Sequence, residues 1–374
     1  MKDFLPFTRP TVDEATIDAV ADVFRSGQLA SGPKVLEFEA ALAAYVGGGR
    51  TLRALTSATE GLEIALIACG VGAGDEVIVP VMSFAASANV ILRVGAKPVF
   101  VDVELASRNL DVSLVERALT ARTRAIMPVH FSGLAVDMDA LLALAARRSL
   151  RIVEDAAHAI GTRHRGRPVG GFGDIAVFSF HPNKNMTSIE GGAVATADAA
   201  VVESVERHRF HGIRRNADGE IDVVLAGAKS NLSDVAAQVG IHQLRRLDGF
   251  NARRRALAAR YFEALGGFEE LVLPARGDEG HSWHMFTVLI DFQKRGLTRA
   301  LFQKAMAARG IGIGVHYPCI PGLTVYRNLG YRAEDYPNAA RIGRETVTLP
   351  LFPAMRDEDV ERVAAALRAE LRGG

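Results

Sequence analysis

The stretch VFSFHPNKNMTSIEGGAVAT, residues 177–196, places one lysine, Lys184, between two apolar runs. Both runs have the length and the apolar character of buried strands. The loop that joins them is too short for a helical crossover, so we expect one of the two strands to run antiparallel. A charged amine is costly to place between buried segments, and Lys184 therefore needs an explanation beyond the fold.

The sequence around this stretch alternates short apolar runs with helical patterns, from about residue 50 to residue 200. Seven strands are predicted, from the runs LRAL, DEVIVP, KPVFVDV, RAIMPVHF, LRIVED, DIAVFSF and GAVAT. Stretches with helical spacing, such as EGLEIALIACG and DMDALLALAARRS, lie between most of them. This alternation predicts an α/β fold with a large, mostly parallel, seven-stranded sheet that is covered by helices on both faces.

A helix is predicted near the N-terminus, from the stretch TVDEATIDAVADVF. Thr11 and Glu14 have the spacing of a capping box at its start. Ile17, Val20 and Phe24 recur at helical spacing and share one face of this helix.

The pattern changes after about residue 230. SDVAAQVGIHQLRRLDGFNARRRALAARYFEAL predicts one or two long helices, and WHMFTVLIDF and GIGVHYP predict strands on either side of the helix TRALFQKAMAARG. The last stretch, DEDVERVAAALRAEL, carries one apolar stripe. We therefore expect a large domain over residues 1–245 and a smaller C-terminal α+β domain over residues 246–374.

Composition excludes several classes of protein. The 374 residues are 49% apolar and 23% charged, as in ordinary globular enzymes. A net charge of +1 favours neither nucleic acid nor an anionic membrane as a partner. No apolar run reaches about 18 residues and the start lacks a secretory core, so we expect a soluble, cytoplasmic protein. The basic stretch NARRRALAAR is interpreted as a solvated helix face.

No metal site is predicted. Cys69 and Cys319 are far apart and have no metal-like spacing. HRFHG and HSWH each place two histidines three residues apart, as on one turn of a helix. No acidic or cysteine ligand stands beside either pair, which favours structural or substrate-binding roles for these histidines.

Polar and aromatic side chains follow the predicted strands. Ligands of open parallel sheets bind beyond the carboxyl ends of the strands. Ala58 and Thr59 start a helix after LRAL, where free N–H groups and the helix dipole favour an anion. Phe84 follows DEVIVP and could cover a planar ligand or belong to the core. Asp155 and His158 follow LRIVED, and a buried carboxylate there needs a cationic partner.

Each signal is weak alone, since a lone lysine on a loop is usually solvated and a hydroxyl at a helix start is usually a cap. Together they describe one ligand, pyridoxal phosphate. Asp155 would keep the ring nitrogen protonated, and Lys184 would bind the aldehyde as an imine. Thr59, Ser179 and the helix N-terminus would hold the phosphate. Phe84 would stack on the ring of this electron-sink cofactor.

Over nearly its whole length, the chain resembles the DegT/DnrJ/EryC1/StrS family of sugar aminotransferases, which have the fold type I of pyridoxal-phosphate-dependent transferases. Within that family, the Ala of SAT and the form VEDAAHA are similar to the UDP-4-amino-4-deoxy-L-arabinose (UDP-4-keto-pentose) aminotransferases. The motifs that carry the resemblance are GQLASGPKVLEFEAALAAYVG, TSATEGLEIAL, GDEVIVPVMSFAASAN, VEDAAHAIG, FSFHPNKNMTSIEGGAVAT, NLSDVAAQVGIHQLRRLD, GIGVHYP and LPLFPAM.

The resemblance implies a role for each matching residue. It implies that Lys184 is the Schiff-base lysine and that Asp155 is the partner of the pyridinium nitrogen. His158 matches a His or Gln that supports the cofactor ring. The remaining cofactor-binding positions implied by the family are the phosphate-binding Ala58, Thr59 and Ser179 and the stacking Phe84.

The resemblance also implies a shared active site. Asn231 matches an asparagine that reaches the phosphate from the neighbouring subunit, so a homodimer is expected; a plain helix cap is the alternative. His316 and Tyr317 lie in a segment that resembles the sugar-nucleotide contacts of the family, and a strand-edge histidine is the alternative for His316. The sequence departs from the family at Phe84, which replaces a Trp of some relatives, in VHFSGLAVDMD, which lacks the Tyr-Gly or Ala-Gly pair that often follows the His, and at Asn183. The last two departures face the substrate side and leave the identity of the sugar open.

The function implied is amino transfer from glutamate to a nucleotide-linked keto sugar, with the keto group expected at C4. The freed Lys184 amine would act as general base and acid, which requires a pKa well below its free value of about 10.4. Related dehydratases carry His in place of the lysine, so Lys184 argues against dehydration. A keto-cyclitol substrate and a non-catalytic sensor on the same fold are the alternatives.

Overall fold

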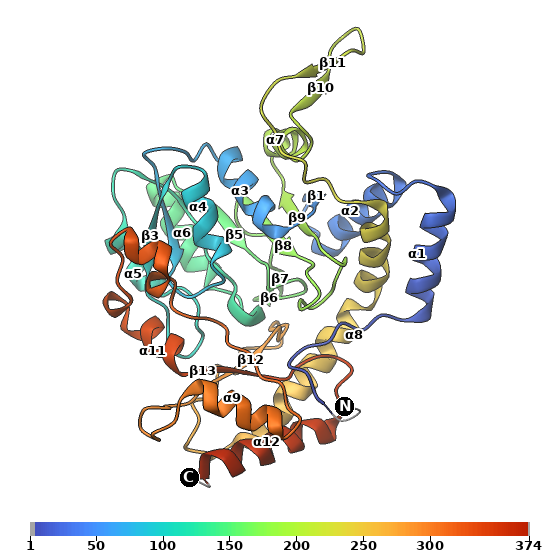
Figure 1. Cartoon of the computed structure of the whole chain (residues 1–374). Helices are drawn as coiled ribbons and strands as arrows, with labels where there is room; N and C mark the ends of the chain where they lie inside the picture. Colours follow the sequence, from blue (N-terminus) through green and yellow to red (C-terminus); the bar gives the residue numbers. More distant parts are fainter. Residues whose placement is uncertain (1–3, 373–374) are drawn as a thin grey trace.

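A computed structural model describes residues 4–372 of the chain (Figure 1). Its centre is a seven-stranded sheet with the strand order β1-β9-β8-β5-β4-β2-β3, and the seven strands predicted from the sequence are all present in it. They are β1 (Thr51–Leu55), β2 (Glu76–Pro80), β3 (Lys97–Val101), β4 (Thr123–Ile126), β5 (Arg151–Asp155), β8 (Ile175–Ser179) and β9 (Gly192–Thr196).

One strand of the sheet, β9, runs antiparallel to both of its neighbours, β8 and β1. The other pairs are parallel, so the prediction of a mostly parallel sheet with one reversed strand is confirmed. The reversed strand starts at Gly192, opposite Ser179 in β8. A Cβ at Gly192 would lie 2.5 Å from the backbone nitrogen of Ala58. The glycine therefore lets the loop before β9 pass directly over the start of helix α3 (Ala58–Ala68).

Helices cover both faces of the sheet, as the alternating pattern predicts. Successive strand residues belong to different hydrophobic clusters, because their side chains point to opposite faces. One cluster includes residues of α2 (Pro33–Val46), α5 (Val112–Ala118), α6 (Met138–Arg148) and the first half of α8 (Asp234–Leu265). The other includes residues of α3, α4 (Ala86–Arg93) and α7 (Ala199–Arg209).

The C-terminal part has its own hydrophobic cluster, below the sheet in Figure 1. Helix α8 is a single helix of 32 residues that enters this cluster with its second half, and the predicted boundary at residue 245 falls within it and stays a prediction. Leu5 also belongs to this cluster, so the N-terminal segment contributes to a core that the sequence assigned to the C-terminal residues alone. The cluster is built around β12 (Phe286–Leu289), β13 (Thr346–Leu349), α9 (Arg299–Ala308) and α12 (Asp357–Arg372).

Smaller elements complete the part of the chain that the structure describes. The antiparallel pair β10–β11 forms a hairpin that projects from the body beside α7 (Figure 1). No helix among the described residues is long and apolar enough to cross a membrane. The remaining elements are α1 (Glu14–Ser26), β6 (Arg163–His164), β7 (Arg167–Pro168), β10 (Ile213–Arg215), β11 (Ile221–Val223), α10 (Thr324–Asn328) and α11 (Pro337–Glu345).

The capping box predicted for α1 is wrong. The cap is Asp13, whose carboxylate accepts a hydrogen bond of 3.0 Å from the backbone of Thr16, because the helix begins two residues later than a cap at Thr11 would place it. The predicted apolar face is also not packed on this chain, since Ile17 is 51% and Phe24 is 58% exposed. This face is therefore available to another molecule.

Two predictions for the C-terminal part are corrected by the structure. GIGVHYP forms only isolated bridges, among them Gly314 to Thr348, and the strand that pairs with β12 is instead β13. The stretch NARRRALAAR is not a solvated face throughout, because Arg254 is 2% exposed. Its guanidinium donates hydrogen bonds to the carbonyls of Leu351 and His284, which fixes α8 against the C-terminal core.

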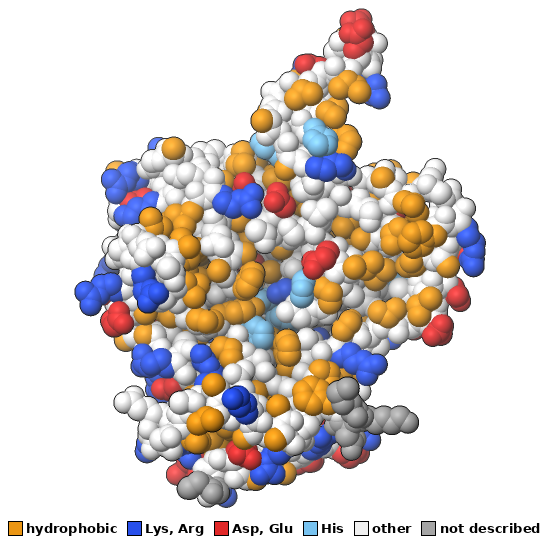
Figure 2. Space-filling view, in the orientation of Figure 1, with side chains coloured by type: hydrophobic (Ala, Val, Ile, Leu, Met, Phe, Trp, Pro, Cys, Tyr) orange, Lys and Arg blue, Asp and Glu red, His pale blue; other side chains and the backbone are white. Residues whose placement is uncertain are grey.

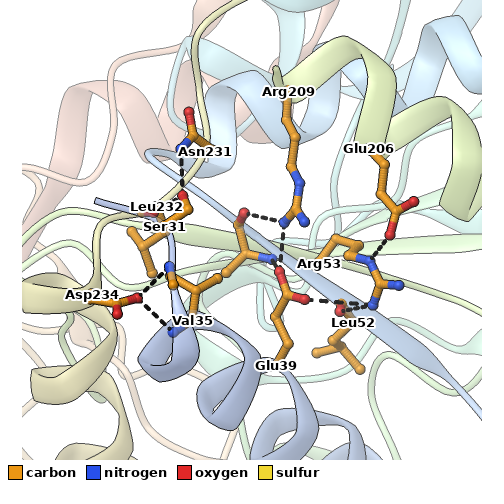
Figure 3. A network of polar contacts seen from close by, with 12 residues as sticks. Ser31, Val35, Glu39, Leu52, Arg53, Glu206, Arg209, Asn231, Leu232 and Asp234 are labelled. Atoms are coloured by element: carbon orange, nitrogen blue, oxygen red, sulfur yellow. Dashed lines mark hydrogen bonds and ion pairs between the residues drawn. The ribbon is translucent and has the colours of Figure 1, made fainter. Parts of the chain in front are cut away.

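A buried polar network joins the start of the chain to the sheet (Figure 3). Glu39 of α2 is 4% exposed and accepts hydrogen bonds from the backbone of Ala54 in β1, at 2.8 Å, and from Arg209 at the end of α7, at 2.6 Å. Arg209 also donates to the carbonyl of Ala54. One buried carboxylate thus links α2 and β1 to α7, which is far from both of them in the sequence.

Asp234 in the first turn of α8 caps a different helix, α2 (Figure 3). Its carboxylate accepts hydrogen bonds from the backbone N–H groups of Gly32, at 2.8 Å, and Val35, at 3.1 Å. Because the N-terminal cap residue of α2 is Gly32, which has no side chain, the cap must come from elsewhere. The contact fixes the start of α8 to the start of α2.

We expect Asp234→Ala to lower the free energy of unfolding by about 1–3 kcal/mol, because two backbone donors lose their acceptor in a buried place. Urea denaturation followed by circular dichroism measures the change. Asp18→Ala, which removes an exposed carboxylate of α1, is the control and should change stability by less than about 0.5 kcal/mol. Equal stabilities of the two variants would contradict the capping role.

Candidate active site

A cavity of about 340 Å³ opens at the carboxyl ends of the central strands. It brings together all the site residues predicted from the sequence except Asn231, although they are spread from residue 58 to residue 317. Figure 2 shows histidine side chains gathered in a hollow at the middle of this face. The predicted residues in the lining are Ala58, Thr59, Phe84, Asp155, His158, Ser179, Lys184, His316 and Tyr317.

Asp155, the last residue of β5, presents a buried carboxylate to the cavity. It is 4% exposed, and it accepts hydrogen bonds from the Ser87 hydroxyl, at 2.6 Å, and from the backbone of Ala157, at 3.1 Å. Burial raises the pKa of Asp155, while these hydrogen bonds and the charge of Lys184 act in the opposite direction. The carboxylate is thus fixed in direction and favours a cation beside it.

Lys184 lies in the loop between β8 and β9 and also lines the cavity. Its backbone N–H donates to the carbonyl of His181, at 2.8 Å, which closes a turn under the side chain. Burial lowers the pKa of Lys184 to about 8, and the charge of Asp155 opposes that shift. Roughly a tenth of the amine is therefore unprotonated at neutral pH, so it can act as a nucleophile and as a base.

The start of α3 provides a place for an anion. The Ser57 hydroxyl caps the helix by accepting from the backbone of Glu60, at 3.2 Å. The N–H groups of Ala58 and Thr59 belong to the first turn, where they have no acceptor within the helix. Both residues line the cavity, and Ser179 lines it from the end of β8. Free N–H groups, the helix dipole and hydroxyls together suit a phosphate.

Aromatic rings form one wall of the cavity. The ring of His158 stacks on Tyr317, with 6.1 Å between the centroids and 20° between the planes. The Tyr317 hydroxyl lies 3.3 Å from Nε2 of His158, and Nδ1 of His158 accepts from the backbone of Ser132. Burial lowers the pKa of His158 well below its ordinary value, so the ring is neutral. The ring centroid of Phe84 lies 5.8 Å from that of Tyr317, and the Phe84 side chain is 58% exposed at the mouth of the cavity.

His316 and Tyr317 come from the C-terminal part of the chain, so both parts of the molecule build the cavity. Nδ1 of His316 lies 2.7 Å from the hydroxyl of Thr348 in β13, which fixes the ring. Burial lowers the pKa of His316 to about 4. The ring therefore offers the ligand a neutral hydrogen-bonding group at physiological pH.

Several lining residues are absent from the sequence-based set. Ser83 and Ser87 lie four residues apart in the segment after β2, a spacing that could have indicated them, and their hydroxyls are 2.7 Å apart. Nε2 of His181 lies 3.6 Å from a carboxylate oxygen of Glu190 across the Lys184 loop, a contact that only the folded loop reveals. The added lining residues are Ser57, Leu62, Ser83, Ala86, Ser87, Val129, Ala157, His181, Asn183, Glu190 and Gly191.

Asn231 does not line the cavity of its own chain. Its side chain donates to the hydroxyl of Ser31 and accepts from the amine of Lys229, and it is half-buried. Figure 3 shows it pointing to Ser31, away from the buried network. Its predicted role, in the site of a neighbouring subunit, is thus not tested by the single chain.

Two residues of the HSWH motif are buried beside the cavity. His281 is 2% exposed, and its Nε2 donates to the carbonyl of Ser132. His284 is 4% exposed, and its ring lies 4.5 Å from that of His158. Among the residues that the structure describes, the group with spacing suited to a metal is a different one, at the surface. It consists of Asp137, Asp139 and His164.

The sequence matches the DegT/DnrJ/EryC1/StrS aminotransferase family over residues 10–368. It is 38% identical, over 381 aligned residues, to the spore coat polysaccharide biosynthesis protein SpsC of Bacillus subtilis. This similarity covers 99% of the present chain and 98% of SpsC.

Solved structures of similar proteins superpose on nearly the whole chain. The putative sugar aminotransferase Spr1654 of Streptococcus pneumoniae in its PMP form has a TM-score of 0.93 and 32% identity, over 99% of this chain and 98% of the other. The same protein is known in a PLP form. The aminotransferase DesI, solved in the presence of its TDP-sugar product, has a TM-score of 0.88 and 31% identity, over 100% of this chain and 94% of the other.

The residues of the cavity fit the cofactor of these relatives. A nucleophilic amine, a buried carboxylate that favours a cation, and the free N–H groups of α3 face one space. These are the groups that a pyridine ring with an aldehyde and a phosphate requires. The chain therefore belongs to the DegT/DnrJ/EryC1/StrS family and is a pyridoxal-phosphate-dependent sugar aminotransferase.

Proposed function

We propose that the enzyme moves an amino group from glutamate to a nucleotide-linked keto sugar, at a 4-keto position. The observation that carries the proposal is the cavity itself, in which Lys184 and Asp155 share one space with polar groups from both parts of the chain. The sugar-nucleotide product of DesI and the polysaccharide role in the name of SpsC support this class of substrate.

In this proposal, the residues of the cavity have separate roles in cofactor binding and proton transfer. When bound, pyridoxal phosphate supplies an electron sink for the carbanion. Asp155 keeps the ring nitrogen charged, and Ala58, Thr59 and Ser179 hold the phosphate. With the cofactor bound, the free amine of Lys184 would take the proton from the donor's α-carbon and would deliver it to the cofactor, as general base and then general acid. With a pKa of about 8, the lysine is suited to both proton transfers near neutral pH.

The charge of the cavity supports a site shared between two chains. Among the described residues that line it, Lys184 is the one lysine, and no arginine is present. A nucleotide diphosphate and the carboxylates of glutamate need more cations than one. Arg214 and Arg215 are exposed on the β10–β11 hairpin, and Lys229 lies beside Asn231. A second copy of the chain would bring these groups to the cavity.

The surface of α1 and α2 supports a homodimer as well. Ile17, Phe24, Leu29 and Leu36 are between 42% and 67% exposed. Figure 2 shows hydrophobic side chains over these two helices. Asn231 is hydrogen-bonded to Ser31, directly after Leu29 and Ala30, so the residue predicted to cross between subunits adjoins this apolar surface. An apolar surface of this kind is typical of a face covered by a second copy.

The direct test is a substrate panel. With glutamate as donor, the purified enzyme should aminate at least one of a set of UDP-, dTDP- and GDP-4-keto sugars, with the UDP-4-keto-pentose included because of the sequence resemblance. Turnover should fall by at least about 1,000-fold in Lys184→Ala, which loses the amine, and by at least about 100-fold in Asp155→Ala. Mass spectrometry of the amino sugar measures the product.

Three results would contradict the proposal. Turnover of the keto-cyclitol scyllo-inosose alone would change the substrate class. Protein that stays colourless with pyridoxal phosphate, with no turnover of any ketone, would indicate a sensor. Lys184→Ala that keeps full activity would remove the lysine from the mechanism.

A mixing experiment tests the shared site. Asn231→Ala and Lys184→Ala should each be nearly inactive as homodimers. Equal amounts, unfolded and refolded together, should regain about a quarter of the wild-type activity, because half of the dimers are mixed and each of those has one intact site. The control pair Asn328→Ala and Lys184→Ala should show about half of the wild-type activity from the start. No gain for the first pair would place the whole site within one chain.

The lowered pKa of Lys184 predicts a pH effect on stability. A buried amine that must stay charged destabilises the folded cofactor-free protein below pH 8. Between about pH 8 and 10.5 the folded state loses this proton before the unfolded state does, so stability rises with pH. Lys184→Met should therefore be more stable than wild type by about 1–3 kcal/mol at pH 7, and the difference should shrink towards pH 10.5.

Urea denaturation of both cofactor-free proteins at pH 7 and at pH 10 measures this difference. A Lys184→Met protein less stable than wild type at pH 7, or a difference that does not change with pH, would contradict the shift.

A further inference from the structure

The residue after Lys184 is buried and makes polar contacts that the proposed function does not use. Asn185 is 4% exposed and, unlike Lys184, does not line the cavity. Its carboxamide nitrogen donates two hydrogen bonds, of 2.7 Å to the Asn251 side chain and 2.9 Å to the carbonyl of Ser282. Consecutive residues thus point in different directions, Lys184 to the cavity and Asn185 to the protein behind it.

The acceptors of Asn185 belong to separate segments of the chain. Asn251 is in the middle of α8 and is 2% exposed. Ser282 precedes β12, and its hydroxyl lies 2.8 Å from the hydroxyl of Thr162. Asn251 also donates to the carbonyl of Ile160, at 3.2 Å. Hydrogen bonds therefore connect the loop that carries Lys184 to α8 and, through Asn251, to the segment that follows Asp155 at the end of β5.

Close packing fixes the position of the Asn251 carboxamide. Gly161 has a φ of +82°, and a Cβ there would collide with the amide nitrogen of Asn251 and lie 2.8 Å from the Tyr45 hydroxyl. The backbone next to Ile160 can approach Asn251 only because this residue is glycine. The Asn251 carboxamide accepts the hydrogen bond from Asn185 with its oxygen, and Gly161 packs closely against its nitrogen.

The Asn185 contacts have a cost that packing alone does not explain. Its carboxamide oxygen is buried without a hydrogen-bond partner among the described residues. An unpaired buried acceptor destabilises the folded state, and an apolar side chain of similar size would avoid that cost. Buried polar groups with such a cost concentrate where a defined geometry is required.

We propose that Asn185 is a positioning residue, which holds the backbone of Lys184 so that the amine is aimed at the space beside Asp155. Through its hydrogen bonds to Asn251 and Ser282, Asn185 fixes the position of the lysine relative to α8, the helix shared by both parts of the chain. The proposal rests on the assignment of Lys184 as the reacting amine. Proton transfer is sensitive to position, and a displacement of about 1 Å costs roughly 100-fold in rate.

Two variants test the proposal. Asn185→Leu removes the donor, and Asn251→Leu removes the acceptor. Asn338→Leu is the matched control, because the Asn338 carboxamide donates a single hydrogen bond of 2.8 Å to the carbonyl of Val103, outside the cavity. In the cofactor-free protein, amide hydrogen exchange of residues 181–191 should be about tenfold faster in both test variants and unchanged in the control.

The cofactor-loaded enzyme provides a second readout. In both test variants, the rate of a single turnover with the amino donor should fall by about 10- to 100-fold, with KM for the donor changed by less than about threefold. The pH midpoint of the visible absorbance of the lysine-bound cofactor should shift. The double variant should lose no more rate than the worse single one, because both act through one hydrogen bond.

A lowered melting temperature with wild-type exchange in the loop and a wild-type single-turnover rate would show a structural role only and would overturn the proposal. If Asn185→Leu does not fold, Asn251→Leu decides by the same readouts, since the acceptor lies in another element. Loop exchange and cofactor absorbance need no sugar substrate. A wrong assignment of the sugar or donor would therefore leave these two measurements unchanged. If Asn185 does not position Lys184, both measurements would stay at their wild-type values in the variants.

Discussion

The chemistry of the site depends on a buried carboxylate and an amine that face one cavity. Burial disfavours the charged form of each group, because it raises the pKa of Asp155 and lowers that of Lys184. Each favours the charged form of the other, and Ser87 fixes the carboxylate further. A ligand with a cationic nitrogen and an electrophilic carbon satisfies both groups, which is why this pair fits a pyridoxal cofactor so well.

The sheet brings this pair together. β5 ends at Asp155, and the loop after its parallel neighbour β8 carries Lys184, so both groups come out at the same edge of the sheet. The reversed strand β9 returns the chain across the start of α3, where Gly192 permits the close approach. Amine, carboxylate and anion site are thereby placed around one space by three neighbouring strands and one helix. The small C-terminal part then closes the space with His316 and Tyr317.

The sequence predicted most of this arrangement, because the sheet is buried on both faces and its strands are short apolar runs. It also singled out Lys184 and Asp155, because the polar residues that follow the predicted strands together suit one cofactor, and the structure brings both to one cavity. It did not predict the role of Ser87, whose hydroxyl matters only because Asp155 lies next to it in space. The strand expected at GIGVHYP failed because its partners come from distant segments, which form only isolated bridges with it. The cap at Thr11 failed because Asp13, two residues further along, caps the helix instead.

The central claim is that the cofactor binds to Lys184 and to no other lysine. Reduction of the cofactor-loaded enzyme with sodium borohydride, followed by digestion and mass spectrometry, tests it directly. We predict a stable pyridoxyl group on the peptide that contains Lys184, and loss of that peptide's label in Lys184→Ala. A label on another lysine, such as Lys229 or Lys34, or no label on a protein that has bound the cofactor, would contradict the account.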